Sequence, residues 1–275
     1  MAAEGVHFLG RSQHQGDIMN FREMHRQPEP LLICNVWDAA SARVAQRVGF
    51  GAIATSSFAM AAMLGYEDGE QLSFQELRYL VARIAAVSTL PLSVDIESGY
   101  SREPKDIVTH IRELAELGVV GVNIEDSLVD QGRSLVNAEA FAEILAKVKA
   151  GLQAAGCDVF LNVRTDPFLL GLDGARAETV RRGALYAQAG ADGLFVPCIV
   201  QSEDIAAITK AVPLPINVLS RPQLPSYATL QALGVKRVSM GNALFDHLQD
   251  NLQARLSEIH EHRTLASIFE VASAC

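Results

Sequence analysis

The chain has 275 residues, of which 49% are hydrophobic, and its formal net charge is −9 at pH 7. This length and apolar content are enough for one large buried core, as in a single α/β barrel, or for two smaller domains. The negative charge and the lack of any Lys or Arg cluster argue against a nucleic-acid partner and favour a small-molecule partner.

The expected compartment follows from what the sequence lacks. The N-terminus has no basic segment followed by an apolar region, and no run of about 18 apolar residues occurs along the chain. The four cysteines show no CxxC spacing and three of them lie in or beside apolar runs, which is typical of reduced core residues. We therefore expect a cytoplasmic protein without a membrane partner.

Short β-branched apolar runs predict eight strands along the chain. They occupy residues 31–36, 51–56, 91–97, 119–125, 158–164, 193–198, 215–219 and 236–241. The stretches between them have apolar residues spaced three and four apart, and most end in Gly, as amphipathic helices do. The clearest predicted helices cover residues 38–49, 73–87, 104–118 and 138–156. Strand and helix therefore alternate throughout.

Continuously apolar strands are typical of a parallel sheet that is covered on both faces. Eight β/α units within about 250 residues fit a closed (β/α)8 TIM barrel better than an open sheet. We predict one barrel domain over residues 1–275, because no linker rich in Ser, Pro or Gly divides the chain. Within it, residues 1–17 are predicted to be a loosely ordered segment and residues 242–275 a helical C-terminal segment.

Several carboxylates are predicted to meet at one end of this barrel, where the C-terminal strand ends and the loops after them form the active site. The third strand ends in Asp95 and Glu97, the fourth in Glu125 and Asp126, the fifth in Arg164 and Asp166 and the seventh in Asn217, while Asp68 lies in the loop after the second. Because Asp95 and Glu97 are two residues apart in a strand, both side chains point to the same side.

Carboxylates gathered in a low-dielectric site repel one another unless a cation neutralises them. Oxygen ligands favour a hard ion, and Mg²⁺ typically takes one or two carboxylates directly and the others through water. We expect Mg²⁺, with Mn²⁺ as an alternative, bound directly by Asp95 and through water by Glu97, Glu125 and Asp68. A single acidic residue after a strand is more often a helix cap or an ion-pair partner, and Asp126 is assigned to that kind.

Six stretches together resemble the isocitrate lyase and phosphoenolpyruvate mutase superfamily. They are NVWDAASARVAQRVGFGAIATSS (35–57), MLGYEDGE (63–70), VDIESGY (94–100), GVNIEDS (121–127), LNVRTD (161–166) and PINV (215–218). They follow the family's order over roughly residues 30–245. Their combination is specific, whereas each piece alone is weak.

The resemblance implies a Mg²⁺-dependent enzyme that makes or breaks a C–C or P–C bond next to an α-oxo or α-hydroxy carboxylate. It places the metal site at Asp95, Glu97 and Glu125. In this site Asp95 binds the ion directly, and the other two act with Asp68 through water. Arg164, Glu125 and Asp68 are accordingly the candidate catalytic residues.

The resemblance also implies how a 2-oxo or 2-hydroxy carboxylate substrate is bound. Ser56, Ser57 and Phe58, after the second strand, look like the segment whose backbone amides and hydroxyl hold the substrate's carboxylate. Arg164 looks like the residue that pairs with substrate oxygens, and Asn217 like a further polar contact. Family members exchange their last helix and form tetramers. The tail is compatible with a swapped C-terminal helix in a homotetramer.

The loop at residues 125–137 departs from the family's pattern. Isocitrate and methylisocitrate lyases carry a Lys-Lys-Cys-Gly-His segment there, and the mutase and phosphonopyruvate hydrolase members carry a lysine. This sequence has no lysine between Lys105 and Lys147, and Arg133 supplies charge but is not a readily deprotonated base. The loop more closely resembles those of oxaloacetate decarboxylase-like members.

Decarboxylation of a β-oxo acid needs only an electron sink at the α-oxo group, so a missing acid/base residue affects it least. We therefore predict a Mg²⁺-dependent lyase that decarboxylates an oxaloacetate-like 2-oxo acid through a metal-stabilised enolate. Two alternatives stay open: a phosphonopyruvate-type P–C mutase or hydrolase, and a degenerate member that binds a 2-oxo acid without turnover. A Schiff-base aldolase is disfavoured, since no lysine falls at the C-terminal end of a predicted strand.

Overall fold

The structure is a computed structural model, and it describes residues 20–129 and 132–269. The chain divides into two units, Met1–Gly241 and Asn242–Cys275, which are described separately. The prediction of a loosely ordered segment at residues 1–17 lies outside the described residues. Within the described ranges, none of the helices has the length and apolar content needed to cross a membrane.

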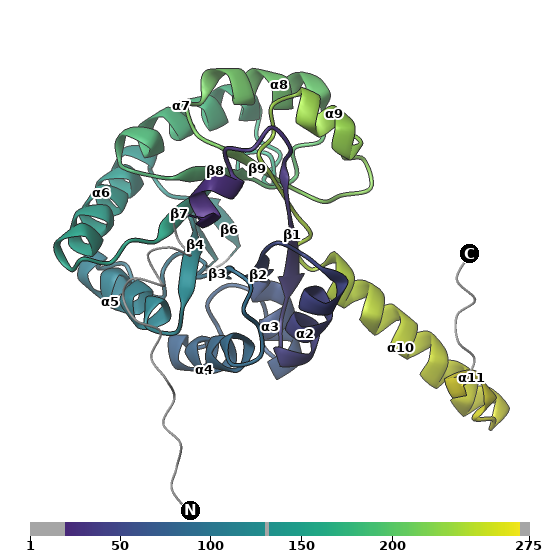
Figure 1. Cartoon of the computed structure of the whole chain (residues 1–275). Coiled ribbons are helices and arrows are strands. Elements are labelled where there is room, and N and C mark those ends of the chain that lie inside the picture. Colours follow the sequence, from purple (N-terminus) through teal and green to yellow (C-terminus); the bar gives the residue numbers. More distant parts are fainter. Residues whose placement is uncertain (1–19, 130–131, 270–275) are drawn as a thin grey trace, which may run out of the picture. The chain divides into compact units, whose positions relative to one another are not determined.

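The first unit contains a closed barrel of parallel strands in the order β1-β10-β9-β8-β7-β4-β3-β2 (Figure 1). The strands are β1 Leu31–Val36, β2 Ile53–Thr55, β3 Leu92–Asp95, β4 Val119–Glu125, β7 Phe160–Arg164, β8 Gly193–Val196, β9 Ile216–Leu219 and β10 Arg237–Ser239. Each strand coincides with one predicted apolar run or falls within it. The predicted (β/α)8 barrel is therefore confirmed.

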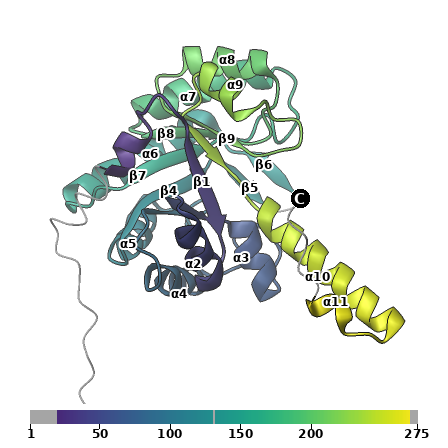
Figure 2. The same cartoon turned by 45° about the vertical axis from the view of Figure 1, so that its right-hand side comes forward.

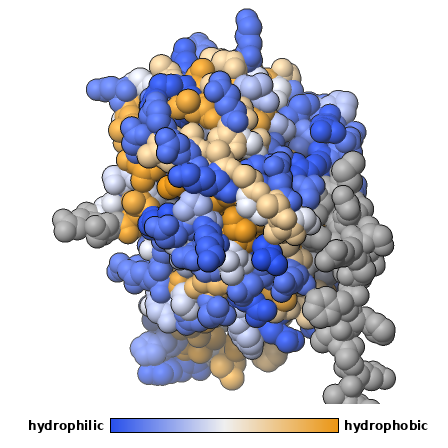
Figure 3. Space-filling view, turned by 90° about the vertical axis from the view of Figure 1, so that its left-hand side faces the viewer, coloured by the Kyte–Doolittle hydropathy of each residue, from blue (hydrophilic) through white to orange (hydrophobic). Residues whose placement is uncertain are grey.

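Helices alternate with the strands and cover the outside of the barrel (Figure 1, Figure 2). They are α2 Ala39–Val48, α3 Ser57–Leu64, α4 Phe74–Ala85, α5 Pro104–Ala115, α6 Ala138–Ala154, α7 Ala175–Gln188, α8 Ser202–Ala211 and α9 Tyr227–Ala232. Asp38 and Ser73 begin α2 and α4 with capping boxes, so these helices start where the sequence offers side-chain acceptors. Figure 3 shows one side of the molecule, where polar side chains cover most of the surface between scattered apolar ones.

A two-stranded antiparallel hairpin, β5 Ser127–Val129 and β6 Arg133–Leu135, follows β4 and was not predicted from the sequence. Its base is tied to the barrel, because the backbone N–H of Val136 donates to the carbonyl of Asp126 at 2.9 Å. Arg182 on α7 donates to the carbonyl of Val136 at 2.9 Å and to the carboxylate of Asp126 at 2.8 Å. Asp126 is thus an ion-pair partner, as predicted, and it anchors the hairpin.

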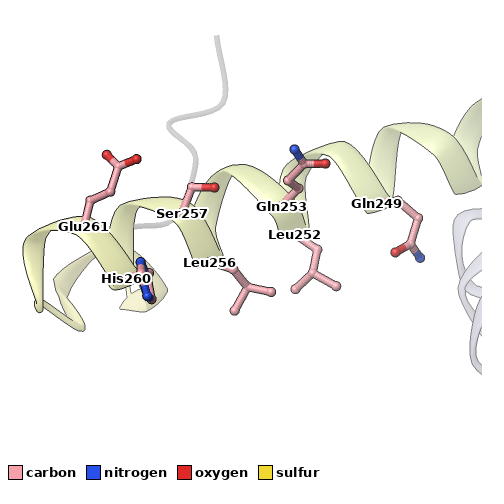
Figure 4. Close-up of a pocket in the computed structure, with 7 residues that line it drawn as sticks. All are labelled: Gln249, Leu252, Gln253, Leu256, Ser257, His260 and Glu261. Carbon is pink, nitrogen blue, oxygen red and sulfur yellow. The ribbon is translucent and has the colours of Figure 1, made fainter.

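The second unit contains α10 Ala243–His262 and α11 Ala266–Phe269. Leucines recur every fourth residue along α10, and their side chains are exposed. They are Leu244, Leu248, Leu252 and Leu256. Figure 4 shows Leu252 and Leu256 pointing to one side of the helix, and Gln253 and Glu261 pointing to the other. This apolar stripe is compatible with the expected contact to another copy of the chain, which stays a prediction.

The barrel interior contains a belt of buried amide side chains. Asn162 donates to Asn123 at 2.9 Å and to Asn217 at 3.1 Å, and Asn217 donates to the hydroxyl of Ser239 at 3.1 Å. All four side chains are buried. Amides can occupy this interior because each supplies both donors and acceptors to its neighbours across the strands.

Arg237 on β10 is an exception to this pairing. It lies two residues before Ser239, so its side chain points to the same, inner side of the strand. The side chain is fully buried, and none of its three guanidinium nitrogens has a hydrogen-bond partner among the described residues. Burial lowers the pKa of Arg237 to about 10, and the negative charge of Asp95 opposes that change. A buried cation without hydrogen bonds lowers the stability of the fold.

We expect Arg237→Met to raise the free energy of unfolding by about 1–3 kcal/mol, because an uncharged side chain of similar length removes the desolvation cost. Urea denaturation at neutral pH measures the change. Arg237→Ala is the control, since it removes the same charge but leaves a cavity and should therefore be less stable than the Met variant. A Met variant less stable than the wild type would contradict this account.

Candidate active site

Asp95 is the last residue of β3, whereas Glu97 lies two residues further on, in a turn. The expectation that both lie in one strand is therefore wrong, and separate neighbours hold their side chains. Asp95 accepts hydrogen bonds from the hydroxyl of Ser57 at 3.0 Å and from the backbone N–H of Glu97 at 3.1 Å. Glu97 accepts hydrogen bonds from the backbone N–H of Glu70 at 2.5 Å and from the hydroxyl of Tyr100 at 3.4 Å. The backbone of Glu97 has a φ of 48°. This left-handed conformation costs a non-glycine residue about 1–2 kcal/mol and is common at functional sites.

Both carboxyl groups have a pKa above its ordinary value. Desolvation, followed by the negative charges of Asp95 and Asp68, raises the pKa of Glu97 to about 8. Desolvation also raises the pKa of Asp95, although the charge of Arg164 opposes the change. Oδ1 of Asp68 is buried and has no hydrogen-bond partner within the described ranges. This part of the site is therefore short of positive charge.

Glu125 and Arg164 face each other from neighbouring strands, because their positions are paired in the register of β4 and β7. Nη1 of Arg164 lies 2.9 Å from Oε2 of Glu125. Its Nε and Nη2 donate to the two oxygens of Asp166 at 2.7 Å and 3.1 Å. This bidentate pair with a fully buried carboxylate fixes the orientation of the guanidinium. Desolvation raises the pKa of Glu125 to about 7 even beside this arginine.

The hairpin brings a second arginine, Arg133, to the same carboxylates. Its Nη1 forms an ion pair with Glu125 and lies 3.1 Å from Oδ2 of Asp166, and its Nη2 lies 3.4 Å from Oδ2 of Asp68. The sequence identified Arg133 as a source of charge but did not place it in the site. Strands of three residues carry too few positions for an alternating pattern, so the hairpin that positions Arg133 left no clear signal.

The predicted substrate-binding residues differ in where the structure places them. Ser57 begins α3 and its hydroxyl donates to Asp95, so it joins the acidic cluster. The hydroxyl of Ser56 caps α3, and the side chain of Phe58 is 42% exposed. Asn217 lies in the buried amide belt. The substrate contacts assigned to these residues stay predictions.

Glu70 supports the site and was missed by the sequence analysis. Its backbone N–H binds Glu97, and its carboxylate accepts hydrogen bonds from the hydroxyl of Ser98 at 2.9 Å and from the backbone N–H of Tyr100 at 2.7 Å. These bonds tie the loop after β2 to the turn after β3. They hold Asp68 close enough for its charge to act on Glu97. Most of these contacts involve backbone groups, which a sequence pattern does not reveal.

No three His, Cys, Asp or Glu side chains in the described part of the chain stand close enough to form a complete metal cage. The donors nevertheless fit an ion that takes one carboxylate directly and reaches the others through water, as Mg²⁺ usually does. Asp95, Glu97 and Asp68 offer hard oxygen donors. Oδ1 of Asp68 has no hydrogen-bond partner among the described residues. The site therefore fits a divalent hard cation, and the individual ligands stay predictions.

Fold and site together define an α/β-barrel protein with an acidic, oxygen-rich site and two arginines at the C-terminal strand ends. The family model described as phosphoenolpyruvate phosphomutase matches residues 21–260. The chain therefore belongs to the phosphoenolpyruvate mutase/isocitrate lyase superfamily, as the sequence predicted. Members of this superfamily are lyases or mutases and generally depend on a divalent metal. This supports the prediction that the chain is an enzyme.

Three similar proteins show the range within this superfamily. An uncharacterised protein of Mycobacterium tuberculosis H37Rv is 36% identical over 224 residues, which cover 82% of each chain. An oxaloacetate decarboxylase of Paraburkholderia xenovorans is 31% identical over 243 residues, covering 84% of this chain and 80% of the relative. The crystal structure of a putative phosphonomutase from Burkholderia cenocepacia J2315 is 36% identical, has a TM-score of 0.84, and matches 89% of this chain and 99% of its own.

The raised pKa of Glu97 predicts how the stability of the metal-free protein depends on pH. The folded protein holds this proton more tightly than the unfolded chain does, so the contribution of Glu97 to stability is fully present at low pH and is lost as the pH rises through about 8. Between about pH 5 and pH 9, we expect the free energy of unfolding of Glu97→Gln to fall by on the order of 1–3 kcal/mol less than that of the wild type. Urea unfolding in EDTA at a series of pH values measures it.

Glu116→Gln, at the exposed end of α5, is the matched control and should leave the pH dependence unchanged. An identical pH dependence in the wild type and in Glu97→Gln would show that Glu97 is ionised in the metal-free protein, which contradicts the prediction.

Proposed function

We propose that the protein is a Mg²⁺-dependent carbon–carbon lyase that decarboxylates an oxaloacetate-like 2-oxo acid. The observation that carries this proposal is the composition of the rim. Carboxylates and two arginines gather at the C-terminal strand ends, and no lysine, histidine or cysteine in the described residues hydrogen-bonds to Asp95, Glu97 or Glu125. Cys198, which follows β8, instead accepts a hydrogen bond from Arg221 at 2.9 Å. Such a site offers charge stabilisation, and it lacks the lysine or cysteine that other members of the family carry in the loop after β4.

The reaction suits these groups. Loss of CO₂ from a β-oxo acid breaks one C–C bond, and its electron pair moves onto the 2-oxo oxygen to give an enolate, which then takes a proton from water. A bound Mg²⁺ supplies a Lewis acid for the developing oxyanion. Asp95 would hold the ion, and the hydroxyl of Ser57 keeps this carboxylate in place. Arg164, oriented by Asp166, would bind a substrate carboxylate through its fork of donors.

The description of one similar structure leaves a second candidate. The structure from Burkholderia cenocepacia with 36% identity is described as a putative phosphonomutase, which favours a P–C bond reaction of the phosphonopyruvate type. A third reading is a degenerate member that binds a 2-oxo acid without turnover. The expected homotetramer and cytoplasmic location also stay predictions.

One activity panel separates these readings. The purified protein is incubated with Mg²⁺ and, in turn, with oxaloacetate, phosphonopyruvate, isocitrate and methylisocitrate, while the loss or appearance of 2-oxo acid is followed. We expect turnover of oxaloacetate or a close relative that EDTA abolishes. Turnover of phosphonopyruvate alone would favour the P–C reaction, and Mg²⁺ binding without turnover of any substrate would favour the degenerate member.

We expect Asp95→Asn to lower kcat/KM by about 1,000-fold or more, because the variant lacks the anionic oxygen assigned to the metal. It should also weaken Mg²⁺ binding, which isothermal titration calorimetry measures without any substrate. Asp173→Asn, in an exposed turn, is the matched control and should change neither quantity. Full activity of Asp95→Asn at saturating Mg²⁺ would contradict the proposed role.

A further inference from the structure

Two guanidinium groups share the same pair of carboxylates at the rim. Arg164 contacts Oε2 of Glu125 and Arg133 contacts Oε1, and both arginines also contact Asp166. Like charges repel at such short range, and the carboxylates of Glu125, Asp166 and Asp68 offset that repulsion here. What remains to be explained is why these carboxylates leave some donors of Arg133 unused.

The protein carboxylates use only part of the hydrogen-bonding capacity of Arg133. Arg164 already pairs with both oxygens of Asp166, and the hydroxyl of Ser127 gives Asp166 a further hydrogen bond. Arg133 makes its close contacts through Nη1, and its Nη2 reaches only Asp68, at 3.4 Å. Its Nε makes no hydrogen bond to any residue that the structure describes. Arg133 therefore has donors left for a ligand.

Both arginine side chains keep part of their surface exposed. The side chain of Arg133 is 16% exposed and that of Arg164 is 14% exposed. Arg133 is also presented by an anchored segment, because Asp126 and Arg182 tie down the end of the hairpin. At the other strand of the hairpin, the side chain of Val129 packs against Gly69, where an added Cβ would stand 2.7 Å from it. Arg133 therefore has a defined position beside Arg164.

We propose that Arg133 binds the distal carboxylate of a dicarboxylic substrate, while Arg164 holds the end that carries the 2-oxo or 2-hydroxy group. This inference rests on the proposed function only in taking the ligand to be a 2-oxo or 2-hydroxy acid. It adds a specificity-determining residue: the site selects ligands with two anionic ends over otherwise identical ligands with one. The planar fork of an arginine matches a carboxylate in two hydrogen bonds, which the point charge of a lysine does not.

The role predicted for Arg133 is in binding and not in the chemical step. As CO₂ leaves, negative charge moves away from the distal carboxylate and onto the enolate. A cation at the distal end therefore stabilises bound substrate at least as well as the transition state. Loss of Arg133 should raise KM for the dicarboxylic substrate and leave kcat unchanged or higher.

Calorimetric titration with a matched ligand pair tests the proposal. Malate and 2-hydroxybutyrate share a 2-hydroxy acid end and differ in the distal carboxylate, and neither has the β-oxo acid group that decarboxylation requires. In the presence of Mg²⁺, the wild type should bind malate more tightly. Arg133→Met should lose about 10- to 100-fold in malate affinity and less than about 3-fold in 2-hydroxybutyrate affinity. Arg133→Lys should fall between the wild type and the Met variant.

Arg176→Met is the matched control, because Arg176 is an exposed arginine that pairs with Asp204, outside the network of Glu125, Asp166 and Glu70. It should change neither affinity. The proposal is overturned if the wild type does not prefer malate, if Arg133→Met weakens both ligands equally, or if it weakens neither. Failure of the proposed function looks different: the wild type would then bind malate in an Arg133-dependent way but would not decarboxylate oxaloacetate.

Discussion

The site depends on one electrostatic constraint, which is the crowding of carboxyl groups at the ends of β3 and β4. Asp95, Glu97 and Glu125 all have a raised pKa, because burial removes the water that would solvate their anions. Among the described residues, arginines form ion pairs with Glu125 but not with Asp95 or Glu97. Glu125 has two of them, whereas Glu97 has only neutral donors. This asymmetry separates a flank that requires a cation from a flank that can bind an anion.

The barrel interior below the rim contains polar and charged side chains within a packed core. The amides of Asn123, Asn162 and Asn217 satisfy one another across the strands, so they add polarity without leaving unpaired groups. Arg237 breaks that rule, since its buried guanidinium has no hydrogen-bond partner within the described ranges. Its pKa responds to the charge of Asp95 above it. Features that lower stability, such as this unpaired buried charge, occur most often near functional sites, and Arg237 lies beneath the acidic rim.

Much of the fold could be predicted because the signals are strong in the sequence itself. Parallel barrel strands are buried on both faces, so each appears as a continuous apolar run, and all eight runs contain strands. The same runs predict Asp95, Glu125 and Arg164 at strand ends, and β3, β4 and β7 end at these residues. These residues lie in regular elements, where position along the chain determines direction.

The parts that escaped prediction depend on irregular backbone or on tertiary contacts. The hairpin that carries Arg133 has strands of three residues, too short for periodicity to identify. Glu70 supports Glu97 through its backbone N–H and has a φ of 59°, neither of which a side-chain pattern encodes. A fully buried Arg237 contradicts the expectation that arginines are exposed. Charged residues whose positions depend on irregular backbone, such as Arg133 and Glu70, are thus harder to place from sequence than charged residues at strand ends.

The asymmetry of the rim also bears on which reaction the site suits. Hydrolysis of a P–C bond needs a water molecule to lose a proton as it attacks, and therefore a base positioned beside it. In decarboxylation no nucleophile needs activation, and negative charge moves from the distal carboxylate to the 2-oxo oxygen. If the distal end lies at Arg133 and the 2-oxo end at Asp95 and Glu97, that charge moves from the arginine flank to the flank that lacks a cation. A divalent ion there would be placed where the charge increases, which is the arrangement that lowers a barrier most effectively.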